Sequence, residues 1–117
     1  MYPLKQQKSI ELLNNSPETF ISTQVINEFS NAFIKKFKAH TLDVLKALEE
    51  IENSFIIYQN NIHTTRLACN LYKRYKFSFY DSLIIAAAIE SGCKVLYSED
   101  MNNHQIIDSL IIINPLL

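Results

Sequence analysis

Tryptophan is absent from the 117-residue sequence, glycine occurs once and proline three times. So little glycine excludes a collagen-like or glycine-rich chain, and it also excludes an all-β fold that depends on many glycine turns. Neither sign of charge dominates, because 11 basic and 12 acidic residues give a formal net charge of −1. The chain as a whole is therefore not built to bind a polyanion, although a local basic patch is compatible with this balance.

Cysteine and long apolar runs are also scarce. Cys69 and Cys93 lie far apart, without a Cys-x-x-Cys or Cys/His pattern, which disfavours a zinc site and a disulfide scaffold. No apolar run approaches the roughly 18 residues that span a membrane, and the first residues carry no apolar signal segment. We therefore expect one cytoplasmic domain over residues 1–117, without a membrane segment and with a single hydrophobic core.

Apolar periodicity predicts helices and strands in alternation. The expected helices cover residues 3–14, 23–37, 41–51, 64–75 and 79–91, and the expected strands cover residues 19–22, 55–58, 94–98 and 109–113. The expected helix caps are Ser22 or Thr23, Thr41, Thr64 or Thr65, Ser78 and, at a C-terminus, the single glycine Gly92. Several strands are apolar on both faces, which favours an α/β fold in which helices cover both sides of a parallel sheet, in three layers.

Two aspartates flank one helix–strand unit of this pattern. The helix after Ser78 rises about 18 Å over about 12 residues, and the strand after Gly92 returns about 16 Å in about five residues. Because these lengths nearly cancel, Asp81 and Asp100 are expected at the same edge of the sheet, where its strands have their carboxyl ends and open α/β folds place their sites. Glu28 follows the strand at residues 19–22 and obeys the same geometry.

Each of these carboxylates also has a simpler explanation. Asp81 can complement a helix dipole, Asp100 can cap a short turn, and Glu28 can be a surface residue. If the three converge, however, they repel one another unless they share protons or bind a cation. Oxygen ligands without cysteine or histidine favour Mg²⁺ or Mn²⁺, which polarise phosphodiesters and generate hydroxide from bound water.

Four segments of the chain, in order and with suitable spacing, resemble the motifs of PIN domains. Residues 21–29 resemble the helix of the second motif, residues 79–88 that of the third, residues 92–101 the strand and turn of the fourth, and residues 113–115 the final strand. The most specific part of the match is the pair formed by residues 80–82 and residues 98–100. The resemblance covers nearly the whole sequence.

This resemblance implies a metal-dependent endoribonuclease, most similar to the VapC toxins of bacterial and archaeal toxin–antitoxin systems. It implies that Glu28, Asp81 and Asp100 are catalytic ligands of Mg²⁺ or Mn²⁺, and that Ser98 supports the site by hydrogen bonding. It also implies an RNA substrate, a cognate antitoxin and a homodimer.

One element of the PIN pattern is missing from the sequence. PIN domains begin with a strand that ends in a metal-binding aspartate, whereas Met1 aligns inside the loop and helix that follow this strand. Because the strand is interior in the family, its absence would leave two neighbouring strands with unpaired backbone groups. Either the chain is an N-terminally truncated nuclease, or it is a degenerate copy with weak or no activity.

Other surface features fit more than one function. Residues 35–38 and 73–76 combine basic side chains with an aromatic ring at predicted helix C-termini, where they complement a helix dipole or contact phosphates and stack on bases. The apolar faces of residues 23–52 belong either to the core or to a dimer or partner groove. The alternative to a ribonuclease is a non-catalytic module that binds an antitoxin or another protein. A receiver-like domain is disfavoured, because the sequence lacks the early aspartate and late lysine that it needs.

Overall fold

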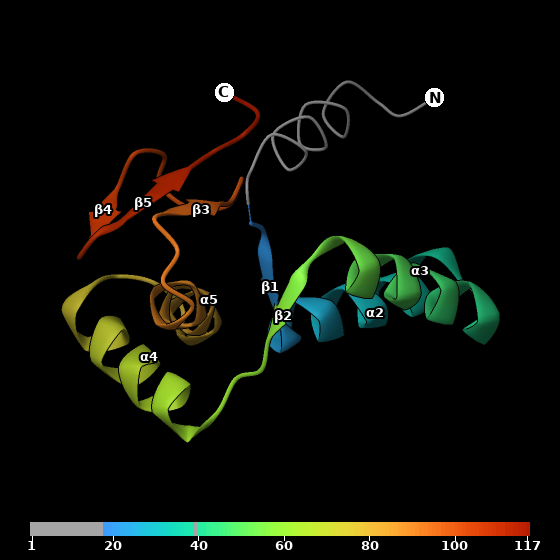
Figure 1. The fold of residues 1–117 in the computed structure, drawn as a ribbon. Helices are drawn as coiled ribbons and strands as arrows, with labels where there is room; N and C mark the ends of the chain where they lie inside the picture. The colour runs from blue at the N-terminus through green and yellow to red at the C-terminus, as the bar shows by residue number, and fades with distance from the viewer. Residues whose placement is uncertain (1–17, 39) are drawn as a thin grey trace.

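The computed structural model describes residues 18–38 and 40–117, which form an α/β fold (Figure 1). The predicted fold class is confirmed; the helix predicted over residues 3–14 lies outside the described residues. The helices are α2 (Thr23–Phe37), α3 (Thr41–Ser54), α4 (Ile62–Arg74) and α5 (Phe79–Glu90). The strands are β1 (Phe20–Ser22), β2 (Ile56–Tyr58), β3 (Val95–Tyr97), β4 (Ile106–Ile107) and β5 (Leu110–Ile113).

The two helices that carry candidate carboxylates begin where the sequence predicts. Ser22 has an extended backbone, and its Oγ accepts a hydrogen bond from the backbone N–H of Val25 at 3.3 Å, which caps α2. The Oγ of Ser78 caps α5 in the same way, at 3.1 Å from the backbone nitrogen of Asp81. Each bond satisfies one of the N–H groups that a helix leaves unpaired in its first turn.

Two other helix starts differ from the prediction. Helix α4 begins at Ile62, not at Thr64 or Thr65, because Asn61 accepts the backbone N–H groups of His63 and Thr64 while the Thr64 hydroxyl accepts the N–H of Asn61. This reciprocal capping box explains why a threonine looked like a cap from the sequence. Helix α3 is preceded by His40, which makes no side-chain capping bond, so the expected cap Thr41 is the first helical residue.

The described strands form two sheets. In one, β1 and β2 run parallel, with Phe20 opposite Ile56. In the other, β5 lies between β3, which is parallel to it, and the short antiparallel β4. The sequence did not predict β4, because two apolar residues between polar turns carry no usable periodicity.

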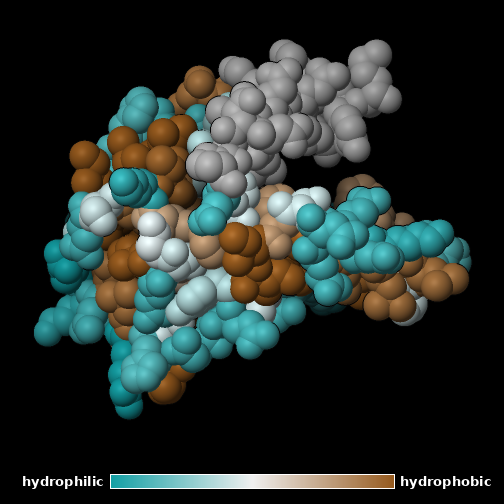
Figure 2. Space-filling view, viewed as in Figure 1, coloured by the Kyte–Doolittle hydropathy of each residue, from teal (hydrophilic) through white to brown (hydrophobic). Residues whose placement is uncertain are grey.

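The core lies where α4 and α5 pack on each other and on the sheet of β3, β4 and β5 (Figure 1). It consists of apolar side chains that are almost completely buried: Ala68, Leu71, Ile85, Ala86, Ile107, Leu110 and Ile112. By contrast, α2 buries none of its residues and α3 buries only Val44. The α2–α3 hairpin therefore projects from the body, with apolar residues exposed along it (Figure 2).

Both ends of α5 are fixed. At its C-terminus, the Glu90 carboxylate accepts hydrogen bonds from the Tyr58 hydroxyl at 2.6 Å and from the fully buried Thr64 hydroxyl at 2.5 Å. Gly92 follows with φ of +76°, a left-handed conformation that suits glycine and turns the chain toward β3, as the sequence indicated. These contacts hold α5 so that Asp81, in its first turn, is presented at the opposite end. None of the helices in the described part of the chain has both the length and the apolar character needed to cross a membrane.

Candidate functional site

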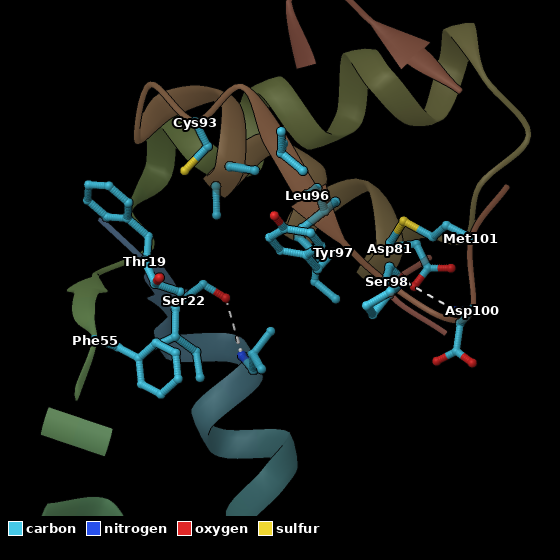
Figure 3. A pocket seen from close by; sticks show the side chains of 18 of the residues that line it. Thr19, Ser22, Phe55, Asp81, Cys93, Leu96, Tyr97, Ser98, Asp100 and Met101 are labelled. Carbon is cyan, nitrogen blue, oxygen red and sulfur yellow. Dashed lines mark hydrogen bonds between the residues drawn. The ribbon is translucent and has the colours of Figure 1, made fainter. Parts of the chain in front are cut away.

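A cavity of about 500 Å³ lies between β1 and β3, with α5 as part of its wall. Its apolar lining comes from Phe20 and Ile21 of β1, Val95 and Leu96 of β3, and several α5 residues. Its polar lining is mostly acidic and follows the carboxyl ends of the strands. In Figure 3, Asp81, Ser98 and Asp100 lie toward one end of the cavity, while Thr19 and Cys93 lie toward the other.

Glu28 reaches the cavity from the second turn of α2 and is exposed to solvent. Its Oε1 accepts a hydrogen bond from Gln24 Nε2 at 2.8 Å, one helical turn earlier. The same Nε2 donates to the backbone carbonyl of Tyr80 at 3.1 Å. Gln24 therefore links the first turns of α2 and α5 and brings Glu28 beside the segment that carries Asp81.

Asp81 lines the cavity from the first turn of α5 and is half-buried. Next to it in sequence, Ser82 is fully buried, and its hydroxyl donates to the Ser78 carbonyl at 2.9 Å. The helix start is therefore rigidly placed. The favourable interaction of a carboxylate with a helix N-terminus remains compatible with this position, so Asp81 serves both explanations that the sequence left open.

Asp100 lies in the turn after β3 and is exposed. The Oγ of Ser98 accepts its backbone N–H at 3.2 Å, and the backbone N–H of Ser98 donates to Ile113 of the neighbouring strand at 3.0 Å. Ser98 thus ties the turn to the sheet and orients Asp100. This geometry agrees with the supporting role that the sequence indicated for Ser98.

All three candidate carboxylates, from positions 28, 81 and 100, line the same cavity. Over residues 18–38 and 40–117, however, no group of three or more histidine, cysteine, aspartate or glutamate side chains is close enough to hold a metal ion together. The donor chemistry fits a divalent cation, because every polar candidate offers oxygen and hard ions such as Mg²⁺ and Mn²⁺ prefer oxygen. The spacing of the donors fits a weak site better than a closed one.

Two cavity features were missed by the sequence analysis. Gln24 was not singled out, although a glutamine four residues before a glutamate on a helix is a recognisable pair; its Oε1 is buried without a hydrogen-bond partner among the described residues. Cys93 lines the cavity just before β3, and burial raises the pKa of its thiol above the ordinary value. Cys93 is therefore less ionised than an exposed thiol at neutral pH and reacts more slowly with alkylating reagents.

The basic clusters lie away from the cavity wall. Lys35 and Lys36 occupy the last turn of α2, and Lys73 and Arg74 occupy the last turn of α4. The guanidinium of Arg74 lies 5.3 Å from the ring centre of Tyr75, a cation–π contact. These positions agree with the simpler explanation, in which the basic residues complement helix C-termini.

Comparison with known proteins gives one result that bears on this site. A family model described as PIN domain matches residues 5–108, a range that includes Glu28, Asp81 and Asp100. No curated protein matches the chain.

Proposed function

The chain belongs to the PIN domain family, whose members are generally nucleases, and we propose that it is a divalent-metal-dependent endoribonuclease of the VapC toxin type. In this proposal it acts in the cytoplasm of a bacterium or archaeon, where it hydrolyses RNA phosphodiester bonds. Glu28, Asp81 and Asp100 hold Mg²⁺ or Mn²⁺.

One observation carries the proposal. Three carboxylates that are distant in sequence line one cavity at the carboxyl ends of parallel strands, and two of them lie on neighbouring helix starts that Gln24 bridges at 2.8 and 3.1 Å. Surface carboxylates with no shared task have no reason to gather in this way, because like charges at one site repel one another.

The side chains have separate tasks in this reaction. A bound divalent cation supplies a Lewis acid for the phosphodiester and lowers the pKa of a water molecule. Asp81 stands on the rigid start of α5, while Gln24 holds one oxygen of Glu28 and leaves the other for a ligand. Ser98 keeps the Asp100 turn in place.

The PIN pattern includes a further aspartate, at the end of a first strand that this sequence does not contain. We propose that, without that carboxylate, this chain holds the cation weakly and cleaves RNA slowly, because the number of charged ligands tunes cation affinity. The absence of a ready three-ligand group among residues 18–38 and 40–117 supports this part of the proposal.

A second candidate function is a non-catalytic module that binds an antitoxin or a second copy of the chain. Large apolar side chains on the α2–α3 hairpin favour it: Ile34, Phe37, Leu42 and Leu45 are between 52% and 75% exposed. Apolar groups that cluster on a projecting element are typical of protein–protein contacts. Partner binding and RNA cleavage do not exclude each other.

RNA cleavage under single-turnover conditions tests the nuclease function. With protein in excess over a labelled single-stranded RNA, we expect slow cleavage that leaves 5′-phosphate ends, requires Mg²⁺ or Mn²⁺ and stops when a chelator is added. Cleavage that persists in chelator would contradict the metal dependence. No cleavage at any metal concentration, from folded protein, would favour the non-catalytic module.

The partner surface is tested separately by size. We expect the wild-type chain to sediment as a dimer and the double variant Phe37→Ser/Leu42→Ser to sediment as a monomer, because both side chains are largely exposed on the hairpin. The matched control is Tyr72→Ser on α4, which removes an exposed aromatic ring elsewhere. A dimer that survives the double variant, or dissociates equally in the control, would place the contact outside the hairpin.

A further inference from the structure

The facing edges of β1 and β3 leave backbone groups without a strand to pair with. In a parallel pair, alternate residues bond to the neighbour. On β1, the Thr19 carbonyl accepts the Ile56 N–H at 2.8 Å, so Thr19 and Ile21 face β2, while Phe20 and Ser22 face the other way. Their main-chain groups find no partner strand within the described part of the chain.

The same argument applies to β3. The Lys94 carbonyl accepts from Ile111 at 2.9 Å and the Ser98 N–H donates to Ile113 at 3.0 Å, so even-numbered residues face β5. Val95 and Tyr97 face away from it. Each of the two edges therefore presents the N–H and C=O groups of two residues, and all four of these residues line the 500 Å³ cavity.

The wall between the two edges suits a strand. Helix α5 contacts both β1 and β3, and Ile84, Ala87 and Ala88 line the cavity from it. The two alanines leave room for larger apolar side chains above them. In Figure 3, Ser22 and Tyr97 face each other across this space. Unpaired edge groups over an apolar base are what an added strand satisfies.

We propose that this slot between β1 and β3 accepts an apolar β-strand of about five residues, donated in trans by a separate polypeptide and running parallel to both edges. The incoming strand pairs on both sides and joins the two sheets into one. Its apolar side chains cover the alanines of α5. The proposal does not depend on nuclease activity.

The observations favour a separate polypeptide over a second copy of this chain. Every strand in the described part of a copy is already bonded to a neighbour, so donation would break that copy's own sheet. Residues 3–14 have a sequence that predicts a helix instead of a strand. A nucleic acid is disfavoured because most of the lining is apolar and its polar part is acidic.

Alkylation of the two cysteines provides the test. Cys93 lines the slot, whereas Cys69 is exposed on α4 and serves as an internal reference. The probe is a capped peptide with five alternating valine and isoleucine residues between lysines. We expect saturating peptide to slow iodoacetamide alkylation of Cys93 by about tenfold or more, with the rate at Cys69 unchanged. The control peptide has proline at the central position, which removes an N–H donor and cannot pair on both edges.

Protein variants locate the bound peptide. Ala88→Phe fills the slot and is expected to abolish protection, whereas Ile106→Lys, on the exposed edge strand β4, is expected to retain it. Circular dichroism checks that each variant is folded, and the comparison of the two peptides on the wild-type protein decides the question if Ala88→Phe is not. Equal protection by the proline peptide, or none by either, would overturn the proposal. Peptide-free protection that grows with protein concentration would also overturn it, because it would identify a second copy as the occupant.

Discussion

Replacement of Asp81 by asparagine is expected to lower metal-dependent RNA cleavage by about a hundredfold or more, since a cation's stabilisation of transition-state charge is worth several kcal/mol. Asparagine keeps the shape of the side chain but removes its negative charge. The cap of α5 depends on Ser78 and on the backbone of residue 81, so the helix start is retained. The rate is measured under single-turnover conditions at fixed Mn²⁺.

Asp43→Asn is the matched control for this variant. Asp43 also lies in the first turn of a helix, α3, but it is exposed and does not line the cavity. We expect it to cleave RNA as the wild type does. An Asp81→Asn protein that is folded and cleaves at the wild-type rate would remove Asp81 from the reaction.

Ile85→Ala is expected to lower the free energy of unfolding by about 2–5 kcal/mol. Ile85 is completely buried at the centre of the core, where α5 packs on α4 and on β5. The substitution loses apolar burial and leaves a cavity that a closely packed interior fills only in part. Because total stabilities are about 5–15 kcal/mol, this loss is large for the chain.

Urea unfolding measures the effect, with Ile34→Ala as the control. Ile34 lies on the projecting hairpin and is 52% exposed, so truncation there is expected to cost less than about 1 kcal/mol. A similar loss in the two variants would mean that the hairpin contributes to the core as much as α5 does.

Local sequence signals predicted the parts of the fold that depend on local physics. Ser22 and Ser78 cap helices because a hydroxyl just before an apolar periodic run accepts first-turn N–H groups. The apolar segment of α5 predicted a buried helix, and its residues form the centre of the core. The balance of helix rise and strand length correctly predicted that Asp81 and Asp100 lie on one cavity.

Features that depend on side-chain partners from distant segments were not predictable in this way. Thr64 looked like a helix cap, but its hydroxyl donates to Glu90, 26 residues later. Gln24 bridges to the carbonyl of Tyr80, 56 residues away. Neither pairing follows from periodicity, which encodes the face of an element and not its neighbours.

The sequence also gave no measure of how closely the carboxylates approach one another. Shared placement at a sheet edge follows from element lengths, whereas metal ligation requires oxygens within a few ångströms. Glu28 and Asp100 are exposed and Asp81 is half-buried, so the three side chains retain rotamer freedom at the cavity rim. Direct measurement of cation binding is therefore the decisive step.

Titration of the protein with Mn²⁺, followed by electron paramagnetic resonance, tests whether the three carboxylates form one cation site. We expect one saturable site that Mg²⁺ competes for, with affinity reduced in each of Glu28→Gln, Asp81→Asn and Asp100→Asn and unchanged in Asp43→Asn. Wild-type Mn²⁺ affinity in all three variants, from folded protein, would contradict the account.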